Sequence, residues 1–238
     1  MPDIRKHRGA HPTDRKLFAE DQLPKLRAAV GELSWLLTRD YAMKGALKLV
    51  GDKFALTDRQ GLPVSRAACS DQSKTHRAST HVAIGDLKGQ LIVIDGFNLL
   101  ITIEAALSGG VLMLGRDGCV RDLSSVHGSY RSVDETDRAI ELIGARLDEL
   151  EVGSVSWILD KPISNSGRLA QRLRNLAAEH EWNWSVEIAF NPDAEIAAAS
   201  ALAISSDGPL LDRVGHWANL ARHLVEKRVA DAWLIDLS

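Results

Sequence analysis

The chain has 238 residues, of which 45% are hydrophobic and 26% charged, with a formal net charge of -3 and a mean hydropathy of -0.11. This composition is typical of a globular chain long enough for a sizeable core and one or two domains. It excludes a membrane-spanning protein, because no apolar run approaches the roughly 20 residues that a spanning helix needs. The basic start lacks the apolar segment of a secretory signal, so we expect a cytoplasmic protein without a membrane partner.

Charge is distributed unevenly along the chain. Residues 1–89 contain 16 Lys and Arg against 10 Asp and Glu, whereas residues 90–238 contain 13 against 22. A basic front and an acidic back indicate two units with different roles, although two solvated surfaces of one domain would give the same counts. The cysteines, Cys69 and Cys119, lack the paired spacing of a zinc site and are expected to be buried, reduced thiols.

The first unit has the pattern of a small all-helical domain. Residues 21–40 place six apolar side chains on one helical face. Residues 42–70 predict a short helix, a break at Gly51 and a second helix capped by Thr57 or Asp58. The apolar face of the first helix comprises Leu26, Ala29, Val30, Leu33, Leu36 and Leu37.

Two helices joined by a turn also outline a helix-turn-helix. In that arrangement Lys53, Arg59 and Arg66 would lie where nucleic acid is contacted. A plain three-helix bundle has the same outline without that function, so both interpretations stay open.

A polar stretch without a sustained period, residues 70–89, predicts the linker between the two units. His76, Arg77 and His81 are the side chains in it that we expect against the second unit. The predicted divisions are a helical domain at 1–75, a linker at 76–89 and an α/β domain at 90–238.

From residue 90 the sequence alternates between strand-length apolar runs and helix-length amphipathic stretches. Such alternation predicts an α/β fold in which a central parallel sheet is covered by helices on both faces. A hairpin is predicted to turn at Arg116-Asp117-Gly118. The predicted strands are 90–95, 154–160, 184–190, 200–207 and 231–236, and the predicted helices are 99–109, 133–151 and 165–181.

Three predicted strands end alike, in Asp95, Asp160 and Asp207. Because the carboxyl ends of parallel strands lie on one edge of the sheet, we expect these carboxylates to converge where ligands bind. Carboxylates at such short distances repel each other and raise each other's pKa unless a cation offsets their negative charge. The sequence therefore predicts a site for Mg²⁺ or Mn²⁺, which take oxygen ligands. Asp193 or Glu195 is the fourth candidate, although Asp193 is explained equally well as a helix cap.

These residues resemble the PIN-like nucleases, and most closely the NYN-type branch, whose first strand carries Asp-Gly-Tyr-Asn. The matching runs are Val-Ile-Asp-Gly-Phe-Asn at 93–98, with Phe97 in place of tyrosine, and Ser-Ser-Asp at 205–207. The resemblance implies a three-layer α/β/α PIN-like sandwich that binds Mg²⁺ or Mn²⁺ through clustered acidic residues and cuts RNA, less often DNA. It implies metal-ligand roles for Asp95, Asp160 and Asp207.

The whole chain also resembles a family of uncharacterised prokaryotic proteins that join a helical N-terminal domain to a PIN-like C-terminal domain. One departure from a minimal PIN domain is the inserted segment at 109–131. Another is that the region around Asp193 lacks the paired acidic residues that active members often show.

Polar side chains near the predicted site are candidates for contact with a phosphate. A helix N-terminus after Asp160 favours anions through its amide groups, and an arginine can bind a phosphate while a histidine lies near the leaving group. Simple helix capping by the asparagines and a surface position for the histidine are the alternatives. The candidates are Asn98, Ser164, Asn165, Arg168, His127 and Arg131.

The function that the sequence favours is a metal-dependent, endoribonuclease-like hydrolase of phosphodiester bonds, with Asp95, Asp160, Asp193 and Asp207 as its catalytic residues. Its partner is nucleic acid, RNA above DNA, and a homodimer is compatible with this interpretation. The alternative is a catalytically inactive PIN-like module that binds nucleic acid or protein. A phosphatase is disfavoured because Asp95 does not begin an Asp-x-Asp motif: Gly96 and Phe97 follow it.

Overall fold

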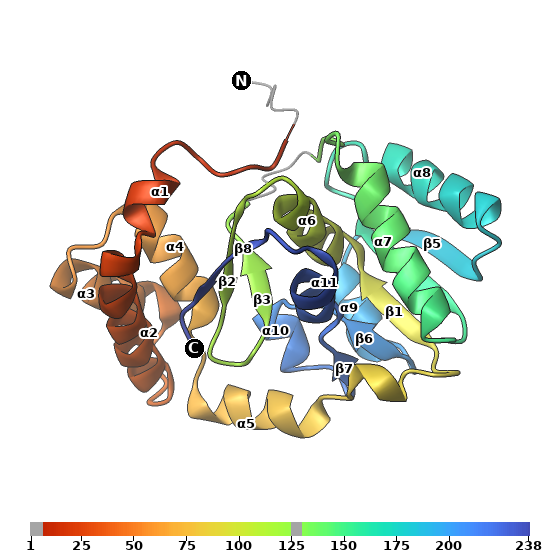
Figure 1. Ribbon diagram of the computed structural model, residues 1–238. Helices are drawn as coiled ribbons and strands as arrows, with labels where there is room; N and C mark the ends of the chain where they lie inside the picture. The colour runs from red at the N-terminus through yellow and green to blue at the C-terminus, as the bar shows by residue number, and fades with distance from the viewer. Residues whose placement is uncertain (1–6, 125–129) are drawn as a thin grey trace.

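The computed structural model describes residues 7–124 and 130–238, so the predicted site residue His127 lies outside the described residues. The chain has an α/β fold with a five-stranded parallel sheet between two layers of helices, preceded by a helical region (Figure 1). The predicted fold class is therefore confirmed. In the described part of the chain, no helix is long and apolar enough to cross a membrane.

The helical region packs the predicted apolar face into its core. Leu26 and Leu33 are fully buried, and Thr57 begins a helix through a complete capping box with Gln60. The predicted break at Gly51 is wrong, because the helix continues through it to Lys53. A glycine inside a helix costs only about 1 kcal/mol. The helices are α1 (Asp14–Leu17), η1 (Glu20–Gln22), α2 (Leu23–Leu37), α3 (Met43–Lys53) and α4 (Asp58–Ala67).

The predicted linker is largely helical. Residues 71–80 form α5 (Asp71–Thr80), which Ser70 caps by accepting a hydrogen bond from the amide of Ser73. Its buried side chain is charged, Arg77, so the helix carries no apolar period from which it could be predicted. A turn of 3-10 helix, η2 (Ile84–Asp86), follows. The expectation that Arg77 and His81 lie against the second unit is confirmed, because Arg77 pairs with Asp212 and His81 forms a β-bridge with Trp217.

The central sheet has the strand order β5-β4-β1-β6-β7, and every neighbouring pair is parallel. The chain first adds strands on one side of β1 and then adds them on the other side. The winding direction therefore reverses between β1 and β6, which is where doubly wound sheets bind ligands. The strands are β1 (Ile92–Asp95), β4 (Val155–Asp160), β5 (Trp184–Ala189), β6 (Leu202–Ile204) and β7 (Trp217–Ala218).

Alternate residues of β1 pack on opposite faces of this sheet. Ile92 and Ile94 belong to the core under four helices, whereas Val93 belongs to a second core under two shorter ones. The first four helices are α6 (Gly96–Leu107), α7 (Thr136–Glu149), α8 (Ser166–Glu179) and α11 (Leu220–Arg228). The two shorter helices are α9 (Pro192–Ala198) and α10 (Gly208–Leu211).

A three-stranded sheet of order β3-β2-β8 joins the helical region to the rest of the fold. The predicted hairpin is confirmed, because β2 and β3 are antiparallel. Val111 and Met113 of β2 pack into the core of the helical region, and Leu112 between them packs against the core of the central sheet. The strands are β2 (Val111–Leu114), β3 (Val120–Asp122) and β8 (Trp233–Asp236).

Candidate carboxylate site at the sheet edge

The site begins where the winding of the central sheet reverses. Asp95 ends β1, and the Ser205–Asp207 segment follows the neighbouring strand β6. The Ser205 hydroxyl donates to Asp95 Oδ2 at 2.8 Å. One turn into α6, the Asn98 side-chain oxygen accepts from the amide and the hydroxyl of Ser206, at 2.8 and 2.9 Å. Side-chain hydrogen bonds thus join the carboxyl ends of β1 and β6, the two parallel strands between which the winding direction reverses.

Gly96 brings the chain into this position because a side chain there would not fit. A β-carbon on Gly96 would lie 2.5 Å from the Leu159 side chain and 2.9 Å from the Ile158 carbonyl oxygen. The first turn of α6 can therefore approach β4 only with glycine at this place. Asn98 does not cap the helix as in the alternative prediction, since its side chain bonds the Ser205–Asp207 segment instead.

Asp95 is buried among other carboxylates. Burial raises the pKa of Asp95 to about 7, the Ser205 hydroxyl opposes that rise, and Asp207, Asp193 and Asp160 add to it. The predicted convergence of the strand ends is therefore seen in the structure. A carboxyl group with this pKa exchanges its proton near neutral pH.

The other three carboxylates lie around Asp95 with greater exposure. Burial raises the pKa of Asp160 and of Asp193. The negative charge of Asp193 raises the pKa of Asp160 further, and the negative charge of Asp207 does the same for Asp193. The prediction that a strand ends in Asp207 is wrong, because β6 ends at Ile204 and Asp207 caps α10 by accepting a hydrogen bond from the Leu210 amide.

The choice between Asp193 and Glu195 is decided by the local structure. Asn191 rather than Asp193 caps α9, because its side chain accepts from the Ala194 amide. Asp193 lines the same cavity as the other three aspartates, whereas Glu195 is exposed and does not line it.

The four aspartates line one cavity of about 680 Å³. Its volume is within the range of pockets that hold a small ligand or a nucleotide-sized group. The helical region supplies the opposite wall, so the cavity is shared between the two parts of the chain. That wall includes Ser65, Arg66, Cys69, Ser70, Ser73 and Arg77.

In the described part of the chain the four carboxylates lack ion pairs, although the positive charge of Arg213 opposes the rise in the pKa of Asp193. Within residues 7–124 and 130–238, no Lys, Arg or His forms an ion pair with Asp95, Asp160, Asp193 or Asp207. Their oxygen atoms and excess negative charge suit a hard divalent cation. Among these same residues, however, no three His, Cys, Asp or Glu side chains stand close enough to hold a metal ion. Binding would therefore require the carboxylates to rotate toward each other.

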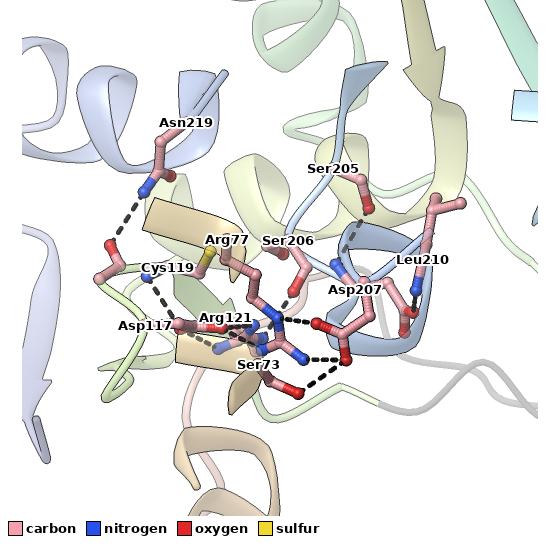
Figure 2. A network of polar contacts seen from close by, with 12 residues as sticks. Ser73, Arg77, Asp117, Cys119, Arg121, Ser205, Ser206, Asp207, Leu210 and Asn219 are labelled. Atoms are coloured by element: carbon pink, nitrogen blue, oxygen red, sulfur yellow. Dashed lines mark hydrogen bonds and ion pairs between the residues drawn. The ribbon is translucent and has the colours of Figure 1, made fainter. Parts of the chain in front are cut away.

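A buried network of charges supports the segment that carries Asp207. Arg77 of α5 and Arg121 of β3 point at the same carboxylate, Asp117 (Figure 2). Each donates a hydrogen bond to it at 2.6 Å. Arg121 Nε also donates to the Ser206 carbonyl oxygen at 2.6 Å. Burial opposes ionisation of Asp117, but the two arginines outweigh it and lower the pKa of that carboxyl to about 2. Helix α5 is thus connected to the Ser205–Asp207 segment through the two ion pairs of Asp117 and the hydrogen bond from Arg121.

Comparison with known proteins places the chain in a family. Residues 84–223 match the model of the family described as "Domain of unknown function (DUF5616)", which is more than half of the chain. The chain belongs to this family. Residues 25–79, which begin inside α2 and end one residue before the end of α5, match a second model described as "Protein of unknown function (DUF434)". The cavity therefore takes its acidic wall from the DUF5616 segment and its opposite wall from the DUF434 segment.

A relative of similar extent occurs in an archaeon. The Methanocaldococcus jannaschii protein described as "Uncharacterized protein MJ0935" is 29% identical over 180 residues, which cover 76% of this chain and 86% of the relative. No solved structure matches the chain.

Several residues predicted to contact phosphate have structural partners outside the cavity. Ser164 and Asn165 bond the backbone of Tyr130, through the Ser164 carbonyl oxygen at 3.2 Å and the Asn165 amide group at 2.8 Å. Arg168 is exposed in the first turn of α8, and Arg131 is exposed with its carbonyl oxygen bonded to Arg8. None of these four residues is among those that line the cavity.

The three cations predicted on the helical region also differ in position. Lys53 pairs with Glu32, and Arg59 forms two hydrogen bonds to the buried carboxylate of Asp14. Arg66 alone lines the cavity, where it donates to the carbonyl oxygens of Asp122 and Ser124.

Sequence reasoning missed the parts of the site that depend on partners far along the chain. The sequence indicates Asp117 only as a turn residue. In the structure Arg121 pairs with Asp117, while Asp122 accepts from the Thr102 hydroxyl. The one feature of the sequence that points to this charge network is the concentration of charged residues within the inserted segment at 109–131. The prediction for Cys69 and Cys119 is confirmed, since both are buried and free.

Proposed function

We propose that this protein is a metal-dependent nuclease that hydrolyses phosphodiester bonds, with RNA favoured as substrate. The observation that carries the proposal is the group of four aspartates at the switch point of a parallel sheet, which line one cavity and form no ion pair with any residue that the structure describes. Uncompensated carboxylates destabilise a fold unless a ligand offsets their charge. The similarity of Asp95, Asp160 and Asp207 to the acidic positions of PIN-like nucleases supports the same function.

The chain's own residues would hold and orient the reacting groups. Asp95, Asp160 and Asp207 would hold Mg²⁺ or Mn²⁺, and Asp193 would hold a second ion or a water. A divalent cation at such a site lowers the pKa of water and offsets negative charge on phosphoryl oxygens. Ser205 fixes the position of Asp95, and Asn98 fixes the segment that ends in Asp207. Arg66 lies on the opposite wall, where its positive charge suits a phosphate.

We further propose that the protein acts in the cytoplasm. Cys69 and Cys119 are both buried and unpaired, which suits a reducing compartment.

Degradation of labelled RNA tests the activity. We expect purified protein to cleave single-stranded or structured RNA with Mn²⁺ and to lose that activity with EDTA. Asp207→Asn should also be inactive, whereas Glu195→Gln is the matched control, because Glu195 is an exposed carboxylate of the same region outside the cavity. Equal cleavage with EDTA and with Mn²⁺, or full activity of Asp207→Asn, would contradict the proposal.

A nucleic-acid-binding module without catalysis is the second candidate. The observation that favours it is that the carboxylates, as they stand among the described residues, do not form a metal-holding group. RNA binding by wild-type protein that yields no product under any divalent cation would support this candidate over the nuclease.

A further inference from the structure

The turns beside the carboxylate site carry an unusually exposed aromatic ring. Phe190 is 74% exposed, more than any other large apolar side chain in the part of the chain that the structure describes. The amino group of Lys161 lies 4.1 Å from the centre of its ring. Phe190 belongs to none of the apolar cores, so the fold gains little from an aromatic residue at this position.

Phe190 and Lys161 both flank the proposed catalytic residues. Lys161 directly follows Asp160 at the end of β4, and Phe190 follows the neighbouring strand β5, three residues before Asp193. The two turns lie side by side, because the Lys161 amide donates to the Ala189 carbonyl oxygen at 2.7 Å. The ring and the cation therefore lie at the same edge of the sheet as the aspartates.

An exposed ring with a cation suits one kind of partner. Proteins hold single-stranded nucleic acid by stacking unpaired bases on aromatic side chains while Lys or Arg neutralises the backbone phosphates. A base in a duplex is already covered on both faces by its neighbours and must be taken out of the stack to reach such a ring. The aspartates at this edge repel a phosphate backbone, so the positive charge of Lys161 beside the ring is what would attract a phosphate there.

We propose that Phe190 and Lys161 form a subsite that binds one nucleotide of a single-stranded nucleic acid, with the base stacked on Phe190 and the phosphate near Lys161. The inference rests on the proposed function, because it places the bound strand beside the cleavage site. The substrate class is then single-stranded nucleic acid, and Phe190 and Lys161 bind it outside the carboxylate site.

The test measures binding separately from cleavage. A fluorescent single-stranded RNA is titrated with full-length protein, once with EDTA and once with Mn²⁺, and its anisotropy is recorded. Stacking of a base on an aromatic ring contributes about 1–3 kcal/mol, so Phe190→Ala should weaken binding roughly 5- to 150-fold, whereas Phe190→Trp should retain it. Lys161→Met should reduce the slope of log affinity against log salt concentration by about 0.7.

Leu91→Ala is the matched control. Leu91 is also a large exposed apolar residue, 55% exposed, but it precedes β1 at the opposite edge of the same sheet. We expect this control to bind RNA as the wild type does. Because Phe190 is exposed, Phe190→Ala should unfold at the wild-type temperature, which separates a lost contact from a lost fold.

The outcomes distinguish this inference from the proposed activity. RNA binding that requires Phe190, in a protein that never cleaves, supports the subsite and contradicts the nuclease. Cleavage and binding that are unchanged in Phe190→Ala support the nuclease and overturn the subsite. Equal affinity for duplex and single strand, or no RNA binding under either condition, also overturns the subsite.

Discussion

The Ser205 hydroxyl, just after β6, donates a hydrogen bond to Asp95 Oδ2 at the end of the neighbouring strand β1, with 2.8 Å between the two oxygen atoms. The same hydroxyl oxygen accepts from the Asp207 amide at 3.0 Å, so one side chain connects the two aspartates. The Asp95 carboxyl is otherwise surrounded by negative charge, and its pKa of about 7 reflects burial that this single bond only partly offsets. The site is therefore held together by hydrogen bonds while its charges repel.

The stability of the protein should fall as the pH rises toward neutrality. In the unfolded chain Asp95 loses its proton near its ordinary pKa of 3.8, whereas in the folded chain it keeps the proton until about pH 7. At Asp95 the folded state binds more protons between these values, so this group should decrease the free energy of unfolding from about pH 4 to pH 7 on the order of 4 kcal/mol. His81 and His223 act in the opposite direction, because burial lowers their pKa values. Urea unfolding in EDTA across this range measures it.

Asp95→Asn removes the titrating group and keeps the shape of the side chain. We expect the variant to show a much flatter pH dependence and to be more stable than the wild type above pH 7. A remaining slope of the same sign is expected from Asp160 and Asp193, whose pKa values are also raised, and one of the opposite sign from His81 and His223, whose pKa values are lowered. Identical slopes for variant and wild type would mean that Asp95 is not protonated in the folded protein.

Ser205→Ala should raise the pKa of Asp95 further, because the hydroxyl is the contact that lowers it. The lost bond should cost roughly 1–2 kcal/mol above pH 7 and less at pH 5, where Asp95 is protonated. Ser65→Ala is the control, since Ser65 lines the same cavity but bonds only within α4, to the Leu62 carbonyl oxygen. A cost that does not change with pH would show that the bond does not act on the charge of Asp95.

Asp117→Asn should destabilise the fold strongly. The substitution leaves the buried side chains of Arg77 and Arg121 without the carboxylate that they share, and breaking one partner of a buried pair costs about 3–5 kcal/mol. Lys48→Met is the comparison, because its pair with Asp52 is exposed on both sides and should contribute no more than about 0.5 kcal/mol. Denaturant unfolding that gave the two variants similar stabilities would contradict this account of the network.

Arg59 and Arg66 lie on one helix and should behave differently toward nucleic acid. Only Arg66 lines the cavity, so Arg66→Met should weaken RNA binding and reduce its salt dependence by about one phosphate contact. Arg59→Met should instead lower the melting temperature, because it leaves the buried Asp14 without its partner, while the folded protein binds RNA normally. The opposite assignment of the two effects would place the nucleic acid on another face of the helical region.

Much of the α/β unit could be predicted because its signals are local. Apolar runs that stop at Asp95, Asp160 and Asp207 indicate strands of one direction, and parallel strands bring their ends together whatever the details of packing. The capping box at Thr57 is likewise contained within four residues.

The remaining features depend on contacts that no local pattern contains. Helix α5 is anchored by ion pairs of Arg77 rather than by an apolar face, and β7 has only two residues, Trp217 and Ala218. The predicted strand at 231–236 corresponds to β8 at 233–236, but its place beside β2 in the second sheet depends on long-range pairing. The bonds of Asn98 to the Ser205–Asp207 segment join residues more than a hundred positions apart.

The most direct test of the central claim is the binding of Mn²⁺ to wild type and to Asp95→Asn, measured by titration calorimetry and followed by RNA cleavage in the same samples. A turn residue would tolerate asparagine, since Asn serves turns and caps nearly as well as Asp. A cation ligand would not, because the substitution removes the negative charge. We predict that the folded variant loses most of its affinity for Mn²⁺ and all Mn²⁺-dependent cleavage, whereas a folded variant that binds Mn²⁺ and cleaves RNA as the wild type does would contradict the account.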